Sequence, residues 1–219
     1  SPLRAALAAS LPDAFARRDV ETALLALTVE SADENRAVLR VRESNRRKGG
    51  AYYMDNEAEL RVTMAQSGGN WYIFDAELLS RTWTGPFGEP APSAEPPSPA
   101  DEEAARQTIA AYLDALNRED LDGALALVHA GSPQRAATER TLAWLFETYD
   151  LTHALEDIRV LERTADEMYV YSVQVTSKTA GPPLSEMRTE YVHTLRLQQG
   201  RWRLFASVEG ERQVLSLPQ

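Results

Sequence analysis

Histidine and tyrosine are the residue types in this sequence that could transfer protons near neutral pH. All three histidines lie in the second half of the chain, at His129, His153 and His193. His193 stands in an alternating segment, so Tyr191, His193 and Leu195 are expected on the inner face of one strand. A histidine beside a tyrosine there could act as a general acid or base. Alternatively it is a core histidine that is hydrogen-bonded to a hydroxyl, and the residue types favour this structural role.

The aromatic residues around His193 define a candidate pocket. They fall on the expected apolar faces of the helices and strands in the second half of the chain. A small apolar molecule is the expected ligand. The candidate ligand-binding residues are Tyr112, Phe146, Tyr149, Tyr169, Tyr171, His193 and Trp202.

Other site chemistries find little support. The chain has no Cys, so disulfides, thiolate metal sites and Cys nucleophiles are excluded. His129 and His153 have no partner at metal-ligand spacing. The run from Asp120 to Gly123 resembles the start of a calcium loop, but the remaining ligands are missing and a helix fits better. We therefore expect neither a metal nor a cofactor. The sequence also identifies no catalytic residue.

Charge limits the partners. The net charge is −10 and the sequence pI is about 4.9, which argues against nucleic acid as a partner. No run of 18 apolar residues is present, so we expect no membrane insertion. One basic cluster stands out before Gly49-Gly50 and is expected at a hairpin tip. There it could dock an anionic partner or the acidic second domain, or it could simply be solvated. The residues of this basic hairpin are Arg42, Arg46, Arg47 and Lys48.

Proline divides the chain. Six of the twelve prolines fall within residues 85–100, which therefore reads as a semi-rigid linker. Residues 1–84 carry a net charge of −1 and residues 101–219 a net charge of −7. We expect a first domain over 1–84 and a second over 101–219.

The two domains are related in sequence. At an offset of 131 residues, 18 of 88 aligned positions are identical, where chance gives roughly a third of that number. Gly69, Trp71 and Phe74 recur in this way as Gly200, Trp202 and Phe205. Val62 occupies the position of His193, so the first copy lacks that proton-transfer group. An internal duplication is indicated.

The second copy predicts three helices and a four-stranded meander. Ser98 to Asp101 resembles a capping box with proline at the first helical position. Further helices are expected over 121–128 and from Ser132, with Asp150 at the last helix end. Alternating segments around Ile158, Tyr171, His193 and Leu204 predict strands.

The first copy repeats only the rear part of this order. A helix over 3–15 precedes strands at 25–29, 37–41, 60–64 and 71–74. Nothing in it corresponds to residues 101–131, so we expect an N-terminally incomplete copy, either naturally shortened or lacking an upstream segment.

This order of elements resembles the nuclear-transport-factor-2-like superfamily, also called cystatin-like or SnoaL-like. The resemblance is carried by the helix Asp120-Leu121-Asp122-Gly123-Ala124-Leu125, by Phe146-x-x-x-Asp150, and by the strand Gly200-Arg201-Trp202-Arg203-Leu204. It implies an α+β fold of two cone-like domains, each a curved, mostly antiparallel sheet packed on helices. It also implies that a catalytic member would place an Asp, or an Asp-Arg-Asp set, in the cone, and no position here matches that pattern.

Two functions of different classes follow. The first is a non-enzymatic binding or assembly module, which holds a small apolar molecule in the second cone or pairs through sheet faces as a homodimer or intramolecular pseudo-dimer. The second is a small-molecule lyase, isomerase or hydrolase that uses His193 and a tyrosine. A third reading is an envelope-associated part of a secretion or transfer apparatus. An exported or envelope-associated location is favoured over the cytoplasm, because the Cys-free composition and the Pro-rich linker are compatible with export; a cytosolic protein can lack Cys as well.

Overall fold

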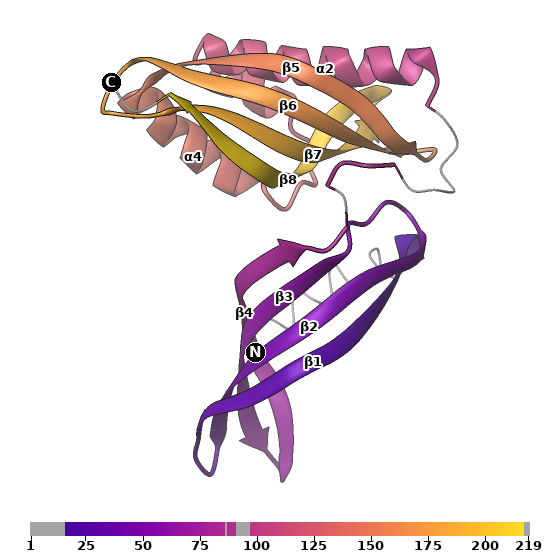
Figure 1. Cartoon of the computed structure of the whole chain (residues 1–219), viewed down its shortest axis with the longest axis vertical. Helices are drawn as coiled ribbons and strands as arrows, with labels where there is room; N and C mark the ends of the chain where they lie inside the picture. Colours follow the sequence, from indigo (N-terminus) through magenta and orange to yellow (C-terminus); the bar gives the residue numbers. More distant parts are fainter. Residues whose placement is uncertain (1–15, 86, 91–96, 217–219) are drawn as a thin grey trace. The chain divides into compact units, whose positions relative to one another are not determined.

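The computed structural model describes residues 16–85, 87–90 and 97–216. The chain divides into two compact units, Ser1–Phe87 and Gly88–Gln219, and the division falls inside the proline-rich segment. Each unit contains one four-stranded antiparallel sheet (Figure 1). The α+β fold class expected from the sequence is confirmed.

The first sheet is a meander of four long strands. Its order is β1 (Arg18–Ala32), β2 (Arg36–Gly50), β3 (Asn56–Ser67) and β4 (Asn70–Trp83). Each strand is more than twice as long as the apolar segment that predicted it, because backbone pairing continues through the polar residues at either end. The helix predicted over residues 3–15 lies outside the described residues.

The second unit begins with three helices, α2 (Pro99–Asn117), α3 (Leu121–Ala126) and α4 (Arg135–Thr148). The capping box at the start of α2 is confirmed: the Ser98 side chain accepts from the backbone of Asp101, and the Asp101 carboxylate accepts from the backbone of Ser98. The start predicted at Ser132 is wrong, since α4 begins at Arg135 without a side-chain cap. Ser132 instead donates to the carbonyl of Phe205 at 2.6 Å.

The second sheet follows the helices. It contains β5 (Asp150–Arg163), β6 (Glu167–Ala180), β7 (Glu186–Gln198) and β8 (Arg201–Ser216) in that order. Asp150 therefore begins a strand and does not end a helix. The helices lie on one face of this sheet (Figure 1).

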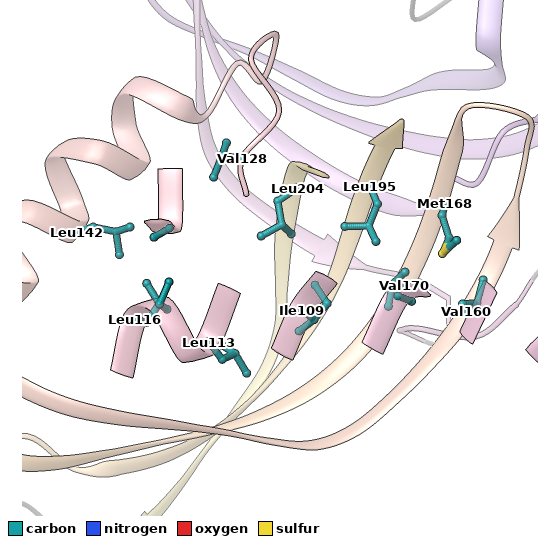
Figure 2. Packing of buried hydrophobic residues seen from close by; sticks show 13 residues of the cluster. Ile109, Leu113, Leu116, Val128, Leu142, Val160, Met168, Val170, Leu195 and Leu204 are labelled. Atoms are coloured by element: carbon teal, nitrogen blue, oxygen red, sulfur yellow. The ribbon is translucent and has the colours of Figure 1, made fainter. Parts of the chain in front are cut away.

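The core of the second unit lies between α2 and the helix-facing side of the second sheet. Ile109, Leu113 and Leu116 lie on α2 and belong to the buried cluster, with Leu116 pointing towards Leu142 (Figure 2). Val170 and Leu195 meet them from β6 and β7, both fully buried. Burying each such side chain contributes about 1.5–3 kcal/mol, so this contact fixes the helix on the sheet.

The two sheets agree in detail at the 131-residue offset. Shifted by 131, the bounds of β1–β4 fall within two residues of those of β5–β8. The irregularities agree as well: the bulge between Leu24 and Ala26 in β1 has its counterpart between Leu155 and Asp157 in β5. Bulges redirect the side chains that follow them, so their coincidence places equivalent residues on equivalent faces. The sheets fit two tandem copies of one unit.

Candidate functional site

His193 lies on β7 on the helix-facing side of the second sheet, and it is 5 % exposed. Its Nδ1 lies 2.8 Å from the hydroxyl of Ser207. Its Nε2 lies 2.9 Å from the hydroxyl of Ser172 and 3.2 Å from the amide nitrogen of Gln174. An amide N–H can only donate, so Nε2 accepts and the ring proton is assigned to Nδ1, where it faces Ser207. Both ring nitrogens are therefore occupied.

Burial decides the protonation state of this histidine. The surroundings penalise the imidazolium ion and lower the pKa of His193 to about 4. The side chains bonded to it are two hydroxyls and an amide, so none of them supplies a negative charge that would stabilise the cation. The ring is neutral at pH 7 and serves as a hydrogen-bonding member of the core.

Tyr191 adjoins His193, and Tyr112 interacts in turn with Tyr191. The ring of Tyr191 stacks on the imidazole at a centroid distance of 5.5 Å and an interplanar angle of 20°. Burial, and secondarily Tyr191, raises the pKa of Tyr112 to about 12. Burial likewise raises the pKa of Tyr191, with a smaller contribution from Glu209. Both phenols therefore stay protonated at neutral pH and can donate hydrogen bonds but not take up a proton.

The structure separates the predicted pocket residues. Tyr169 and Tyr171 do not join His193, because directly paired residues share a face and the partner of His193 on β6 is Val170. The tyrosines on either side of Val170 therefore point to the opposite face. There Tyr169 donates to Glu167 at 2.6 Å, and Tyr171 donates to Glu190 at 2.9 Å.

The remaining aromatic residues lie on the helix side but away from the imidazole. Phe146 and Trp202 pack against the hydrophobic core. Tyr149 follows the end of α4 and meets the ring of Trp144 edge-on at 5.8 Å. Of the predicted set, Tyr112 has an indirect link to His193: it interacts with Tyr191, which stacks on the imidazole, and it lines a cavity together with Ser207.

Two cavities open beside Tyr112. The larger, of about 340 Å³, lies between α2 and α4 and is lined by Tyr112, Gln134, Ala137, Thr138, Thr141 and Leu142. The smaller, of about 40 Å³, shares Tyr112, Gln134 and Thr138 and reaches Ser207. His193 lines neither cavity and is separated from the smaller one by its partner Ser207.

Sequence reasoning missed the residues that hold His193. Ser172, Gln174 and Ser207 are small or polar side chains without a catalytic signature. The available signal was the pair Ser172 and Gln174, two polar residues on the inward face of an otherwise apolar strand. A buried polar pair of this kind requires a hydrogen-bond partner.

The opposite face of the second sheet carries a buried ion pair. Arg196 Nε lies 2.6 Å from Glu167 Oε1, and the Glu167 side chain is 1 % exposed. The guanidinium of Arg196 also lies 3.6 Å above the ring of Phe205. The register places Glu190 and Arg196 on the face opposite His193.

The basic residues of the first unit do not form a hairpin tip, because β2 runs to Gly50 and includes all four. Arg42 pairs with Glu57 at 3.1 Å and Lys48 with Glu21 at 2.9 Å. Arg46 stands opposite Glu21 in the ladder, and Arg47 donates to the carbonyl of Gly50. Their charges are largely matched within the sheet, which weakens the case for an anionic partner there.

Within residues 16–85, 87–90 and 97–216, no cluster of three or more His, Asp or Glu side chains could hold a metal ion. No helix in that same part of the chain is both long and apolar enough to cross a bilayer.

Comparison with known proteins gives a family match within the second unit. Residues 107–215 match the family model described as anti-sigma-I factor RsgI9, C-terminal domain. No curated protein matches the sequence significantly.

Several solved structures are similar. A protein of unknown function with a cystatin-like fold from Nostoc punctiforme PCC 73102 is 12 % identical, with a TM-score of 0.44, covering 52 % of this chain and 93 % of its own. An NTF2-like protein of unknown function from Pseudomonas putida KT2440 is 17 % identical, with a TM-score of 0.42 and coverages of 52 % and 87 %. A provisionally described scytalone dehydratase from Novosphingobium aromaticivorans DSM 12444 is 17 % identical, with a TM-score of 0.45 and coverages of 54 % and 89 %.

The topology of the second unit is simple. Three helices precede a four-stranded antiparallel meander, and the helices cover one face of the sheet. The second unit is an α+β domain, and it is similar to the RsgI9 C-terminal domain and to solved structures described as cystatin-like or NTF2-like.

Proposed function

We propose that this chain is a non-enzymatic binding and assembly module that self-associates through its first unit. One observation carries the proposal: the first sheet exposes an apolar face whose counterpart in the second unit is covered by helices. The residues that define this apolar face of the first sheet are Leu27, Val29, Trp71, Ile73 and Leu78, which are between 41 and 56 % exposed.

The register makes these side chains one continuous surface. Leu27, Val41, Leu60 and Leu78 stand opposite one another in a single row across all four strands. Residues that pair directly share a face of the sheet. The row crosses the whole width of the sheet, so the exposed apolar side chains on the edge strands are joined by those on β2 and β3.

The second unit supplies the comparison. At the 131-residue offset, Val29 corresponds to Val160 and Ile73 to Leu204, both buried in the helix-covered core. Contiguous exposed apolar surface of this kind marks an interaction site.

The other face of the first sheet is charged and exposed to solvent. Arg40 pairs with Glu30 at 2.8 Å and with Glu59 at 3.3 Å. Arg61 pairs with Glu30 at 3.2 Å and with Glu77 at 3.1 Å. Alternating charges of this kind are typical of a solvated sheet surface.

A second copy of the chain is the partner that the charges favour. Residues 1–84 carry a net charge of only −1, against −7 for residues 101–219. Two first units can therefore approach each other without the repulsion that two second units would meet. A two-fold arrangement brings the same apolar patch from each copy together.

The assembly proposal predicts a dimer that single charges disrupt. Light scattering on the eluting protein is expected to give about twice the 24.3 kDa of one chain. Ile73→Lys or Val29→Lys places a charge on the apolar face and is expected to raise the dimer dissociation constant by about 100-fold or more.

The control for this experiment lies on the other face. Thr28→Glu places a charge at an exposed position on β1 that stands opposite Arg40, on the charged face, and it should leave the dimer intact. Circular dichroism checks that each variant folds. The proposal is contradicted if the wild-type protein stays monomeric at 100 times the concentration used for light scattering. It is also contradicted if a dimer survives both apolar-face variants.

Catalysis is the less supported role. The histidine that could transfer protons has both nitrogens bonded, and the tyrosines near it have raised pKa values. The matched family is described as a domain of an anti-sigma factor, and that description also favours binding over catalysis.

The second unit offers room for a small ligand. The cavity of about 340 Å³ beside Tyr112 lies within the range of small-molecule sites. Its lining combines the apolar side chains of Ala137 and Leu142 with four residues that carry polar groups, which suits a small apolar molecule with a polar group: Tyr112, Gln134, Thr138 and Thr141.

Filling that cavity tests the ligand proposal. Indole is a suitable probe, and its binding is expected to shift the NMR signals of Thr138 and Ala137. Ala137→Trp is expected to weaken indole binding about tenfold or more by occupying the space. Glu139→Gln, on the same helix but outside the lining, is the control. Equal binding to both variants contradicts this site.

A further inference from the structure

A groove rich in arginine opens on the second unit, away from His193. It has a volume of about 570 Å³ and lies between the α3–α4 connection and the turn that joins β7 to β8. Its nine lining residues contain three arginines and no carboxylate: Leu125, Ala126, Val128, Ala130, Arg135, Gln198, Gln199, Arg201 and Arg203. From this geometry we propose that the groove binds a small molecule through an oxyanion group, a carboxylate or a phosphate.

The cations converge although their surroundings are acidic. Residues 101–219 contain twelve Lys and Arg against nineteen Asp and Glu. In such a unit an arginine usually finds a carboxylate partner at the surface. Among the described residues, Arg201 and Arg203 have neither a hydrogen bond nor an ion pair for their guanidinium groups, so both remain available to a ligand.

The groove is held rigid before any ligand arrives. Arg135 donates through Nη1 to the carbonyls of Leu125 and Val128, at 2.7 and 2.8 Å. Gln198 accepts through its side-chain oxygen from the backbone N–H of Ala130 at 3.1 Å, which ties the two walls together. Such preorganisation lowers the entropic cost of binding.

The turn between the strands fixes the spacing of the free arginines. Gln199 and Gly200 both have positive φ, at 52° and 74°, as a tight two-residue hairpin requires. Arg201 and Arg203 follow at i and i+2, so they project from the same face of β8. Two planar guanidinium groups side by side suit the oxygen atoms of a carboxylate or phosphate.

An anion would also relieve a repulsion within the sheet. Arg203 stands directly opposite Arg196 in the ladder. Like charges in such positions are destabilising. Glu167 neutralises Arg196, but no described residue neutralises Arg203, so a bound oxyanion would supply the missing negative charge.

The groove is not a general feature of the repeated unit. The positions of Arg201 and Arg203 are occupied in the first unit by Asn70 and Tyr72. The hairpin turn is retained there as Gly68-Gly69, also with positive φ. The turn therefore belongs to the shared fold, while the arginines are an addition specific to the second unit.

NMR titration of the full chain tests the proposal with two probes, inorganic phosphate and succinate, at constant ionic strength set by sodium chloride. Saturable shifts of the Arg201 and Arg203 side-chain signals are expected with at least one probe, and the probe that saturates identifies the oxyanion. Arg201→Gln and Arg203→Gln are each expected to raise the dissociation constant about tenfold, and the double variant by about 100-fold. Arg140→Gln, on α4 outside the groove, should bind like the wild type.

Three results would overturn this inference. One is the absence of a saturable shift with either probe, and another is an equal shift produced by chloride alone. The third is an equal loss of binding in Arg140→Gln. The oligomeric mass of each variant is measured in parallel, so a failure of anion binding is distinguished from a failure of the proposed assembly.

Discussion

Acidification from pH 7 to pH 4 is expected to remove about 3 kcal/mol from the free energy of unfolding of the second unit through His193 alone. The pKa of this ring is lowered to about 4 in the folded protein. In the unfolded chain it returns to about 6.5. The unfolded state therefore binds the proton more readily, so the stabilising contribution is complete above pH 6.5 and is lost as the pH falls towards 4.

The measurement must separate the two units and the other titrating groups. Urea denaturation is followed by resolved NMR signals of β6 and β7 at each pH. His193→Gln should flatten the pH dependence by about 3 kcal/mol relative to the wild type, even though it lowers stability at pH 7 by loosening the contacts with Ser172 and Ser207. Carboxylates contribute equally to both proteins and cancel in the difference.

The other histidines provide the control. Burial lowers the pKa of His153 and of His129 as well, so both contribute with the same sign. Each is only partly buried, and His153→Gln is expected to change the pH dependence much less than His193→Gln. A directly titrated His193 pKa near 6.5 would contradict the buried, fully bonded ring. Equal melting temperatures of His193→Ala and the wild type would contradict its core role.

The sequence predicted the fold of the second unit because its patterns are local. The capping box at Ser98 and Asp101 lies within four residues, and its geometry depends on little else. Alternation along β7 likewise placed His193 and Leu195 on the buried face. Strand lengths were underestimated, since β2 continues through Arg46 and Lys48 to Gly50. Backbone hydrogen bonds do not require apolar side chains, so hydropathy marks the centre of a strand and not its ends.

The candidate site was harder to predict because it depends on register. β6 is buried on both faces, with Val170 on one and Tyr171 on the other. Hydropathy therefore cannot say which face carries the tyrosines relative to His193. Ser207 reaches the imidazole only after an irregularity in β8 at Phe205, which shifts the pairing by one residue. Neither fact is encoded in a short segment.

The same long-range pairing creates the second large effect, at Glu167 and Arg196. Their Nε to Oε1 distance is 2.6 Å, and the carboxylate is 1 % exposed while the guanidinium is 19 % exposed. Arg196→Met removes the cation and leaves a buried carboxylate without its main compensation. The expected loss in the free energy of unfolding is about 3–5 kcal/mol. Urea denaturation followed by the same signals of β6 and β7 measures it.

A second substitution separates two effects of Arg196→Met: the loss of the attraction between Arg196 and Glu167, and the cost of leaving the Glu167 carboxylate buried without a cation. Glu167→Gln in the Arg196→Met background removes the buried charge and keeps an acceptor for the Tyr169 hydroxyl. The double variant should therefore regain about 1–3 kcal/mol relative to Arg196→Met. Arg188→Met is the matched control, because the Arg188–Glu156 pair has 34 % and 44 % exposed side chains and is worth about 0–1 kcal/mol.

The sign of the recovery is decisive. A double variant less stable than Arg196→Met would mean that the Glu167 carboxylate stabilises the fold even without Arg196, because other hydrogen-bond donors compensate its charge. A loss below about 1 kcal/mol in Arg196→Met would place Glu167 in contact with water. The first unit has Arg36 and Ala65 at the corresponding positions, so the buried pair is not required by the shared topology. The Glu167–Arg196 pair is specific to the second unit, where it lies buried on the sheet face that the helices do not cover.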